Sequence, residues 1–457
     1  MVDSEIKDGV AIIPEGITEV GCGTNPNSCT KLDIINNGYN SNCSSPSNDT
    51  GDNEEINAKE TLKNNTMFHF SLGSKELFHS NFLHWLSIIK PTEFLNLMHE
   101  FAGISKFWWE DCYTQKEHGT HCEVRRESDN FDLSIWINLK AVPQDPESSK
   151  WVPVLVLENK MKSLTRKDQL EGYVQKAYEK WGKRDLKNKQ EDKQNSSPII
   201  TFILLTLVED KNNYDVGFDF TIGRKKQRQF NSNWAKKTYN DLASSLDKFL
   251  KKDNSLNDQI INSYKGFIKA MCVLGKSWSV NNSTEWKNIL SQDDLNDIRI
   301  NDIHQKLVYS QIERLLINEL GTDIKEVKTG SGFSNGSGLV EASVIKVEKG
   351  LTFMVQVQGR QYRRAIIGTN KDAVAEAANN RDLWGKFFCF EDKNLDYEFP
   401  FDNDIKPKEN KHPKSKSSYG KLFNYYGQSF AYQYVDIPDG TSVEKVINAM
   451  ITDITKN

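Results

Sequence analysis

Two apolar stretches on either side of a polar loop form the clearest pattern in the chain. In the first, residues 131–139, every odd-numbered position is apolar and most even-numbered ones are polar, which is typical of a strand. The second, residues 151–160, is apolar at four consecutive positions from Val154 to Leu157 and ends on Glu158-Asn159-Lys160. A continuous apolar run indicates a strand that is buried on both faces. We therefore predict an antiparallel hairpin around the loop 140–150.

The hairpin register brings charged groups together. If Leu139 pairs with Trp151, the same register sets Asp132 opposite Glu158, and directly paired residues have Cβ atoms roughly 4.5–5.5 Å apart. Side chains alternate along a strand, so Lys160 shares the face of Glu158. Two carboxylates this close resist joint ionisation unless a divalent cation lies between them. The pattern therefore predicts a metal site at Asp132 and Glu158, with an ammonium group beside it.

Helical periodicity precedes the hairpin. Ser74 is a favourable N-cap for a helix whose apolar positions recur to Ile89, and Pro91 ends it. Glu76 lies in the first turn of this helix, where an acidic residue complements the helix dipole. A second helix is predicted from Thr92 to Phe101. A strand around residues 121–127 then leads into the hairpin.

A helix and a further strand follow the hairpin. Thr165 is the predicted N-cap of the helix, and Gly182 is a natural stop. An apolar strand follows at residues 199–207. A strand–helix–strand unit in one sheet implies a right-handed crossover. The predicted fold class is α/β, with a mixed-sheet αβββαβ core and helices on both faces.

The chain divides into three parts by pattern. Residues 1–65 are rich in small polar residues and are predicted to be loosely attached, because they bury too little apolar surface. Residues 66–290 hold the core and two further helices between Trp234 and Leu274. Residues 291–457 begin with a helix from Asp293 to Glu319 and continue as a glycine-rich loop, residues 330–338, before three strands at 339–347, 352–357 and 361–367. This last part is predicted to be a second, C-terminal α+β domain.

Composition narrows the class of protein. The 457 residues are 37% hydrophobic and 27% charged, with a net charge of −4, so nucleic acid would have to bind a local basic face. The longest apolar runs fall short of the ~20 residues of a membrane helix, and the first residues lack the features of a signal peptide. Seven scattered cysteines suit a reducing compartment. We expect a cytoplasmic protein that does not contact a membrane.

Two groups of cysteine and histidine residues raise the question of zinc. The first is Cys22, Cys29 and Cys43, which match no short Cys-x-x-Cys pair and have no evident fourth ligand. The second is Cys112, His118, His121 and Cys122, in which adjacent residues on a strand would point to opposite faces. Ordinary thiols are favoured over zinc at both places, although zinc binding by the N-terminal cysteines stays open.

The order of these features resembles the PD-(D/E)XK nuclease superfamily. The residues that carry the resemblance are a leading helix with Glu76-Leu77-Phe78-His79-Ser80, Asp132 on a strand, Glu158-x-Lys160 on the next, and Gln169-Leu170-x-x-Tyr173 on a helix. They are most similar to a prokaryotic branch and span roughly residues 72–267. Phe131 stands where the name-giving proline would be. The resemblance implies a restriction-endonuclease-like core.

The resemblance also implies a function and a set of site residues. It implies a Mg²⁺-dependent endo- or exonuclease that hydrolyses phosphodiester bonds, with DNA as the expected substrate, Mn²⁺ as a substitute and defence against foreign DNA as a role. The expected metal ligands are Asp132, Glu158 and Glu76, while Lys160 and Gln169 complete the catalytic set. The alternative is a non-catalytic nucleic-acid-binding or assembly module on a nuclease scaffold. A homo-oligomer is compatible with both.

Overall fold

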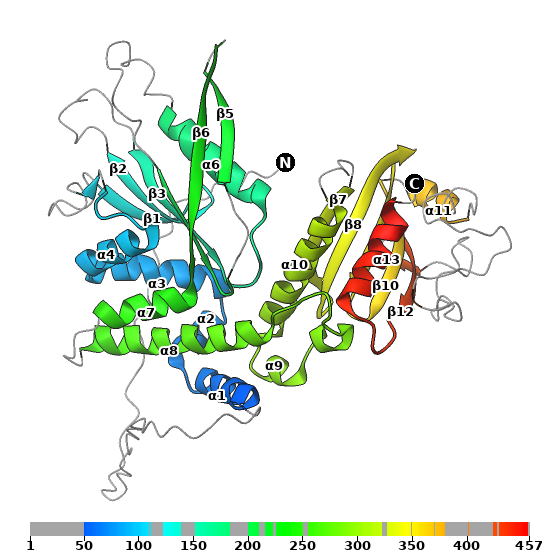
Figure 1. Cartoon of the computed structure of the whole chain (residues 1–457), viewed down its shortest axis with the longest axis horizontal. Helices are drawn as coiled ribbons and strands as arrows, with labels where there is room; N and C mark the ends of the chain where they lie inside the picture. The colour runs from blue at the N-terminus through cyan, green and yellow to red at the C-terminus, as the bar shows by residue number, and fades with distance from the viewer. Residues whose placement is uncertain are drawn as a thin grey trace, which may run out of the picture. The chain divides into compact units, whose positions relative to one another are not determined.

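The computed structural model describes residues 50–107, 109–110, 122–138, 151–182, 200–209, 215–222, 225–249, 255–321, 327–348, 350–369, 371–379, 401, 424–426 and 429–455. Two six-stranded sheets organise this part of the chain (Figure 1). The first sheet has the order β1-β2-β3-β4-β6-β5 and the second has the order β11-β12-β10-β9-β8-β7. Helices pack against both sheets.

The first sheet is mixed. Its strands are β1 (Cys122–Ser128), β2 (Phe131–Asn138), β3 (Trp151–Lys160), β4 (Thr201–Thr206), β5 (Asp215–Ile222) and β6 (Lys225–Thr238). Strands β1, β2 and β3 are antiparallel neighbours, β3, β4 and β6 run parallel, and β5 pairs antiparallel with β6. Helix α3 (Lys75–Ile89) precedes β1, and α6 (Lys167–Gly182) connects β3 to β4. The predicted αβββαβ core is therefore confirmed.

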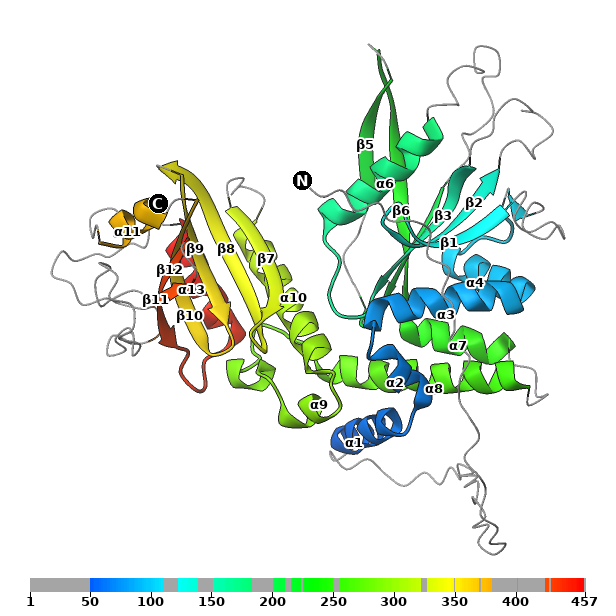
Figure 2. The same cartoon turned by 180° about the vertical axis from the view of Figure 1, so that it is seen from behind.

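Helices cover both faces of this sheet. On β3, the side chain of Asn159 donates to Ser80 of α3, while Glu158 accepts from Tyr173 of α6, so the two helices lie on opposite faces. Figures 1 and 2 show α3 and α4 (Pro91–Ala102) on the side away from α6. The remaining helices here are α1 (Thr50–Lys63), α2 (Thr66–Ser71), α7 (Tyr239–Phe249) and α8 (Leu256–Ser277). Residues 152–159 of β3 are all buried, as the continuous apolar run predicts.

The hairpin register differs from the prediction near the loop and agrees with it at the far end. Trp151 pairs with Asn138 and not with Leu139. A β-bulge then adds one residue to β3, because Trp136 pairs with Pro153 and Ile135 with Leu155. Proline has no N–H for the ladder and is therefore accommodated at bulges. Beyond the bulge Leu133 pairs with Leu157, so Asp132 and Glu158 are next in line.

The second sheet is antiparallel throughout. Its strands are β7 (Val327–Ser334), β8 (Ser337–Glu348), β9 (Leu351–Gln358), β10 (Gln361–Gly368), β11 (Asn424–Tyr426) and β12 (Phe430–Asp436). The accompanying helices are the 3-10 helix η2 (Trp286–Ile289), α9 (Asp293–Asp297), α10 (Asn301–Leu320), α11 (Lys371–Asn379) and α13 (Val443–Thr455). This arrangement is the predicted α+β unit, although the helix expected from Asp293 to Glu319 is divided into α9 and α10.

The glycine-rich run is part of a hairpin and not a loop. Residues 327–334 form β7, and the turn to β8 contains Asn335 and Gly336 with φ angles of 50° and 78°. Asn-Gly is the strongest short hairpin signal, because both residues tolerate a positive φ. The dipeptide could have identified this turn from the sequence.

Two other expectations fail locally. Trp234, expected near the start of a helix, lies in β6, which continues to Thr238 before α7 begins, and the hairpin of β5 and β6 was not predicted. Residues 50–63, expected to be loosely attached, form α1, and Leu62 is fully buried. A helix that is polar overall needs only a few apolar contacts to pack against the rest of the protein. Average composition is therefore a poor guide to whether such a segment is ordered.

Gly338 makes the closest backbone approach in the second sheet. A Cβ atom at this position would lie 2.2 Å from the ring of Tyr309 on α10, which is fully buried. We expect Gly338→Ala to destabilise the protein by about 1–3 kcal/mol, the usual cost of overpacking. Chemical unfolding measures this. Gly332→Ala is the control, because its Cβ would meet only ordinary contacts at 3.8 Å; equal stability of the two variants would contradict the prediction.

Candidate active site

Glu158 is the most enclosed charged residue at the end of the β2–β3 hairpin. Its side chain is 1% exposed, and its Oε1 atom accepts hydrogen bonds from the Tyr173 hydroxyl at 3.1 Å and from the Gln169 amide at 3.3 Å. The Lys160 ammonium lies 2.7 Å from the same oxygen. The Oε2 atom is buried. One oxygen of this carboxylate thus has three polar partners, whereas the carboxyl group as a whole also interacts with Asp132.

Asp132 is held beside Glu158 by the backbone. The N–H group of Asn159 donates to Asp132 Oδ2 at 2.6 Å, so the carboxylate is tied to the strand that carries Glu158. The Asn159 side chain points to the other face and donates to Ser80 at 2.7 Å. The structure therefore brings Asp132, Glu158, Lys160 and Gln169 together.

The two carboxyl groups hold protons more tightly than usual. Burial, followed by repulsion from Glu158, raises the pKa of Asp132 to about 8. Burial also raises the pKa of Glu158, and the attraction of Lys160 only partly offsets this effect. For Lys160, burial acts to lower the pKa, but attraction by Glu158, Asp132 and Glu76 raises it overall. Lys160 is therefore a cation, and the carboxyl pair has excess affinity for positive charge.

The donor set fits a hard divalent cation. Such ions prefer oxygen ligands, and the site offers two adjacent, largely buried carboxyl groups, of which Asp132 carries a proton at neutral pH and donates a hydrogen bond to Glu158. In the described part of the chain, however, no three His, Cys, Asp or Glu side chains form a group able to hold a metal ion. Any ion here would take its other ligands from water or substrate.

Glu76 lies near the pair but has a different partner. It is in the first turn of α3, where its Oε2 atom is 3.9 Å from the Lys162 ammonium. Its charge contributes to the raised pKa of Lys160. Glu76 therefore belongs to the surroundings of the site, and its direct role as a metal ligand stays a prediction.

Tyr173 contacts Glu158 and Gln169, although it was not among the predicted catalytic or metal-binding residues. It is four residues after Gln169 on α6, so the two side chains share one face of the helix. The Gln169 amide donates to the Tyr173 hydroxyl at 2.9 Å, and both groups contact Glu158. The four-residue spacing was visible in the sequence, but a tyrosine in an apolar stripe is usually interpreted as core. Burial and the neighbouring Glu158 raise the pKa of Tyr173 to about 12, so its hydroxyl is a donor.

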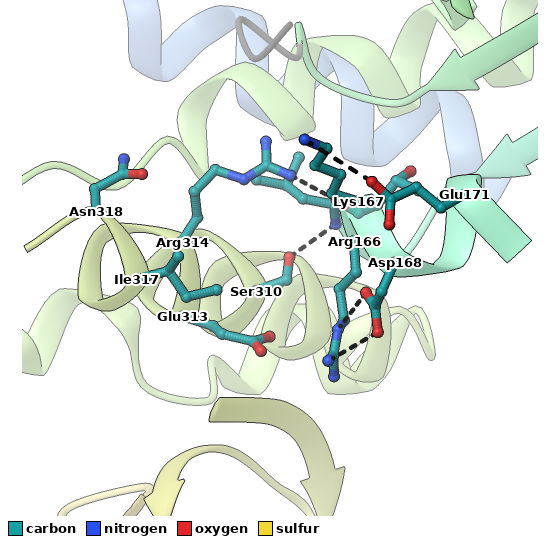
Figure 3. Close-up of a pocket in the computed structure, with 11 residues that line it drawn as sticks. Arg166, Lys167, Asp168, Glu171, Ser310, Glu313, Arg314, Ile317 and Asn318 are labelled. Atoms are coloured by element: carbon teal, nitrogen blue, oxygen red, sulfur yellow. Dashed lines mark hydrogen bonds and ion pairs between the residues drawn. The ribbon is translucent and has the colours of Figure 1, made fainter. Parts of the chain in front are cut away.

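The loop between β3 and α6 is attached to α10. The Leu164 N–H donates to Ser310 Oγ at 2.9 Å, and Arg314 donates to the Thr165 carbonyl at 2.8 Å. A cavity of about 420 Å³ lies between the start of α6 and α10; Figure 3 shows Arg314 and Ser310 reaching across it. The helix begins at Lys167, one residue later than the predicted N-cap Thr165 implies. Because neither Asp132 nor Glu158 lines this cavity, it is separate from the carboxylate pair.

His79 stabilises the helical layer behind the site in its neutral form. Its ring is buried, its Nδ1 atom lies 2.8 Å from the Tyr264 hydroxyl, and it stacks on Phe267. Burial lowers the pKa of His79 to about 3. Below pH 6.5 His79 is protonated in the unfolded chain but stays neutral in the folded chain. The free energy of unfolding therefore decreases as the pH falls.

This titration gives a measurable pH dependence. We expect His79 alone to reduce the free energy of unfolding by about 2 kcal/mol between pH 7.5 and pH 5. In His79→Phe, which keeps an aromatic ring, this part of the pH dependence should disappear. Urea unfolding at both pH values measures it, and His69→Gln serves as the control because His69 is exposed. An unchanged pH dependence in His79→Phe would contradict the assignment.

Several sequence-based expectations fall outside the described residues. These are the N-terminal cysteines Cys22, Cys29 and Cys43, together with Cys112, His118 and His121. Cys122, the last member of the second group, is a buried cysteine at the start of β1. None of the described helices combines the length and apolarity needed to span a bilayer.

Comparison with known proteins agrees with the geometry. The family model of the PD-(D/E)XK nuclease superfamily matches residues 64–266, a range that contains α3, the β1–β3 meander, α6, β4 and the Asp132–Glu158 pair. Searches among curated proteins and among solved structures return no match.

Proposed function

Residues 64–266 belong to the PD-(D/E)XK nuclease superfamily, and from this premise we propose that the chain is a Mg²⁺-dependent nuclease that hydrolyses phosphodiester bonds in DNA. The observation that carries the proposal is the pair of largely buried carboxyl groups, Asp132 and Glu158, which lie side by side next to Lys160 and interact through the proton that Asp132 carries. Two carboxylates this close cannot both ionise without a large electrostatic cost. Their juxtaposition is explained if a bound cation replaces the proton.

Each residue of the site has a physical role in this proposal. Asp132 and Glu158 would hold the ion through oxygen, with water and a phosphate oxygen as further ligands. When bound, Mg²⁺ or Mn²⁺ supplies polarisation of the phosphoryl group and makes hydroxide accessible near neutral pH. Lys160 orients the attacking water and stabilises the negative charge that develops on phosphorus-bound oxygen. Its raised pKa makes it unsuitable as a general base.

Gln169 and Tyr173 act on Glu158. Both donate to Oε1, and so they orient Oε2 toward the position of the ion. Gln169 is therefore a positioning residue in this proposal, and Glu76 assists by attracting metal-bound water. Loss of the Tyr173 hydroxyl would therefore reduce the affinity of the site for the metal ion.

A substrate panel tests the proposal. The full chain is incubated with plasmid, single-stranded DNA, RNA and ATP, with Mg²⁺, with Mn²⁺ and with a chelator. We expect metal-dependent cleavage of DNA, and a loss of about 10³-fold or more in Glu158→Gln, because the metal and its charge stabilisation are removed. Glu171→Gln on α6 is the matched control, because Glu171 pairs only loosely with Lys167, at 3.8 Å.

The outcomes separate the rival readings. Cleavage of ATP alone would favour a nucleotide hydrolase. DNA binding without cleavage under every metal condition would favour a non-catalytic binding or assembly module. Calorimetric titration of Mg²⁺ into the wild type and Glu158→Gln adds a measurement that does not depend on turnover. Undiminished cleavage by Glu158→Gln would refute the role of this carboxylate.

The proposal extends to a cytoplasmic role against foreign DNA. It rests on the superfamily resemblance, and it predicts that bacterial cells producing the wild type resist phage infection better than cells producing Glu158→Gln. Plaque counts on the two strains, at matched protein levels, measure the effect. Equal plaque counts on the two strains would contradict the defence role but would leave the proposed nuclease activity untouched.

A further inference from the structure

The loop between β3 and α6 joins two residues of the candidate active site. It consists of residues 161–166; Lys160 precedes it, and Gln169 lies in the first turn of the helix that follows. The end of the strand is fixed, because the Leu207 N–H donates to the Lys160 carbonyl at 3.0 Å. The path of this short loop therefore sets where α6 begins relative to the end of β3.

Two side chains of α10 hold the loop by its backbone. The Oγ atom of Ser310 accepts from the Leu164 N–H at 2.9 Å. Arg314 donates to the Thr165 carbonyl at 2.8 Å, and Figure 3 shows both side chains on the same side of the helix. Ser310 and Arg314 are four residues apart, which places them on one helix face. Ser310 and Thr165 are buried, so these contacts are strengthened by the low dielectric around them.

Helix α10 is itself fixed by the second sheet. The side chain of Gln305 is fully buried and accepts from the Gly338 N–H at 3.0 Å. Glu313, which is 4% exposed, accepts from the Ser331 hydroxyl at 2.6 Å. One face of α10 is therefore bonded to β7 and β8, and the neighbouring face is bonded to the loop before α6.

The same helix also contacts the start of α3. Lys75 forms an ion pair with Asp302 in the first turn of α10 and donates to the Arg299 carbonyl at 3.0 Å. The next residue along the chain is Glu76. Helix α10 is therefore bonded to the two segments that lead into Glu76 and Gln169.

We propose that Ser310 and Arg314 are positioning residues of the candidate active site. They hold the loop so that Gln169, on α6, stays within reach of Glu158. The amide of Gln169 lies 3.3 Å from Glu158, at the long end of the range for a hydrogen bond, so a small displacement of α6 breaks this contact. The inference rests on the proposed nuclease function and adds a requirement for α10, which lies outside the range of the family match.

Steady-state kinetics of DNA cleavage by the full chain test the proposal. We expect Ser310→Ala and Arg314→Gln each to lower kcat by about 10-fold, the lower end for groups that orient metal ligands. KM for DNA should stay unchanged, because neither side chain contacts the substrate in this proposal. Arg314→Lys keeps a donor for the Thr165 carbonyl and should recover most of the loss. Asn318→Ala is the matched control, because Asn318 is exposed one turn further along the helix and lines the same cavity.

The kinetic outcomes are decisive in either direction. If Ser310→Ala and Arg314→Gln have the kcat of Asn318→Ala, the inference is overturned. A higher KM at unchanged kcat in Arg314→Gln would also overturn it, because Arg314 would then bind DNA directly. Ser310→Ala removes a single oxygen atom, so this variant remains informative if a variant of Arg314 folds poorly.

Hydrogen exchange separates the inference from the nuclease assignment. Exchange of peptides from residues 161–173 is followed by mass spectrometry in chelator, with peptides from residues 201–206 of β4 as the reference. We expect exchange in the first set to be about 10-fold faster in Ser310→Ala/Arg314→Gln, because these contacts oppose local opening, and exchange in β4 to be unchanged.

The exchange result is independent of turnover. Faster exchange at residues 161–173 in this double variant, combined with a wild type that cleaves no DNA, would uphold the hold of α10 on α6 and refute the nuclease. Exchange equal to that of Asn318→Ala would overturn the inference even if the wild type cleaves DNA. Equal acceleration in β4 would also overturn it, because the two side chains would then support the whole fold and not the position of α6.

Discussion

Replacing Asp132 with asparagine should abolish cleavage and, in metal-free protein, make the fold more stable at alkaline pH. The pKa of Asp132 is raised from 3.8 to about 8 by burial and by Glu158. A raised carboxyl pKa contributes stability that is present below pH 3.8 and is lost as the pH rises through 8. At pH 9 the ionised carboxylate is therefore a cost on the order of 5 kcal/mol.

Asparagine removes the charge and keeps the shape. Its amide oxygen can still accept from the Asn159 N–H group, which donates to Asp132 at 2.6 Å in the wild type. Unfolding in urea with chelator at pH 6 and pH 9 measures the stability, and a Mg²⁺-dependent cleavage assay measures the activity. Asp168→Asn, at an exposed position on α6, should change neither. If Asp132→Asn is less stable than the wild type at pH 9, the ionised Asp132 does not destabilise the fold. If Asp132→Asn still cleaves DNA, Asp132 is not a required metal ligand.

The same physics predicts proton release on metal binding. Because Asp132 carries a proton at pH 7, a cation that binds the pair must displace it. Calorimetry of Mg²⁺ binding in two buffers with different heats of ionisation should report about one proton released at pH 7 in the wild type. Asp132→Asn should release none. If the wild type and Asp132→Asn release equal numbers of protons, a group other than Asp132 loses the proton when Mg²⁺ binds.

Replacing Asp453 with alanine should be among the most destabilising single changes in the part of the chain that contains the second sheet and α13. Asp453 on α13 forms two hydrogen bonds of 2.6 Å with Arg364 of β10 and accepts a third, of 2.7 Å, from Tyr362. The side chains of Arg364 and Asp453 are 5% and 4% exposed. Removing one partner leaves a buried charge uncompensated, which costs about 3–5 kcal/mol.

A surface pair in the same region provides the control for Asp453. Arg360 and Asp439 are 3.2 Å apart with side chains 55% and 71% exposed, so Asp439→Ala should cost at most about 1 kcal/mol. The double variant Arg364→Met/Asp453→Leu should recover much of the loss, because it removes both charges. Urea unfolding measures all three. Similar stabilities for Asp453→Ala and Asp439→Ala would contradict the role of the buried pair.

Calorimetry of Asp453→Ala also addresses the domain boundaries predicted at residues 65 and 290. Separate domains would show separate unfolding transitions, and Asp453→Ala would lower the midpoint temperature of only one of them. A single transition would instead indicate that the contacts of α10 with Leu164 and Thr165 join the two sheets into one cooperative unit.

Local pattern in the sequence determined the strands and the order of the core. Period-two alternation in residues 131–138 and the continuous apolar run in 151–157 predicted β2 and β3, because burial imposes these patterns directly on a strand. The same alternation placed Glu158 and Lys160 on one face and Asn159 on the other, and the structure agrees. These properties depend only on neighbours along the chain.

Tertiary structure decided the parts that depend on groups distant in the chain. The predicted pairing at the loop end was off by one residue, and only the bulge opposite Trp136 brought Asp132 back beside Glu158. The burial of Glu158, its raised pKa and the contact of the Tyr173 hydroxyl with it arise because α6 closes one face of the sheet. The hairpin of β5 and β6 was missed, although β5 alternates between polar or small and apolar residues from Asp215 to Ile222 and could have been identified as a strand; only β6 is mostly polar. A sequence determines which side chains share a face, whereas packing determines how deeply they are buried and which atoms lack partners.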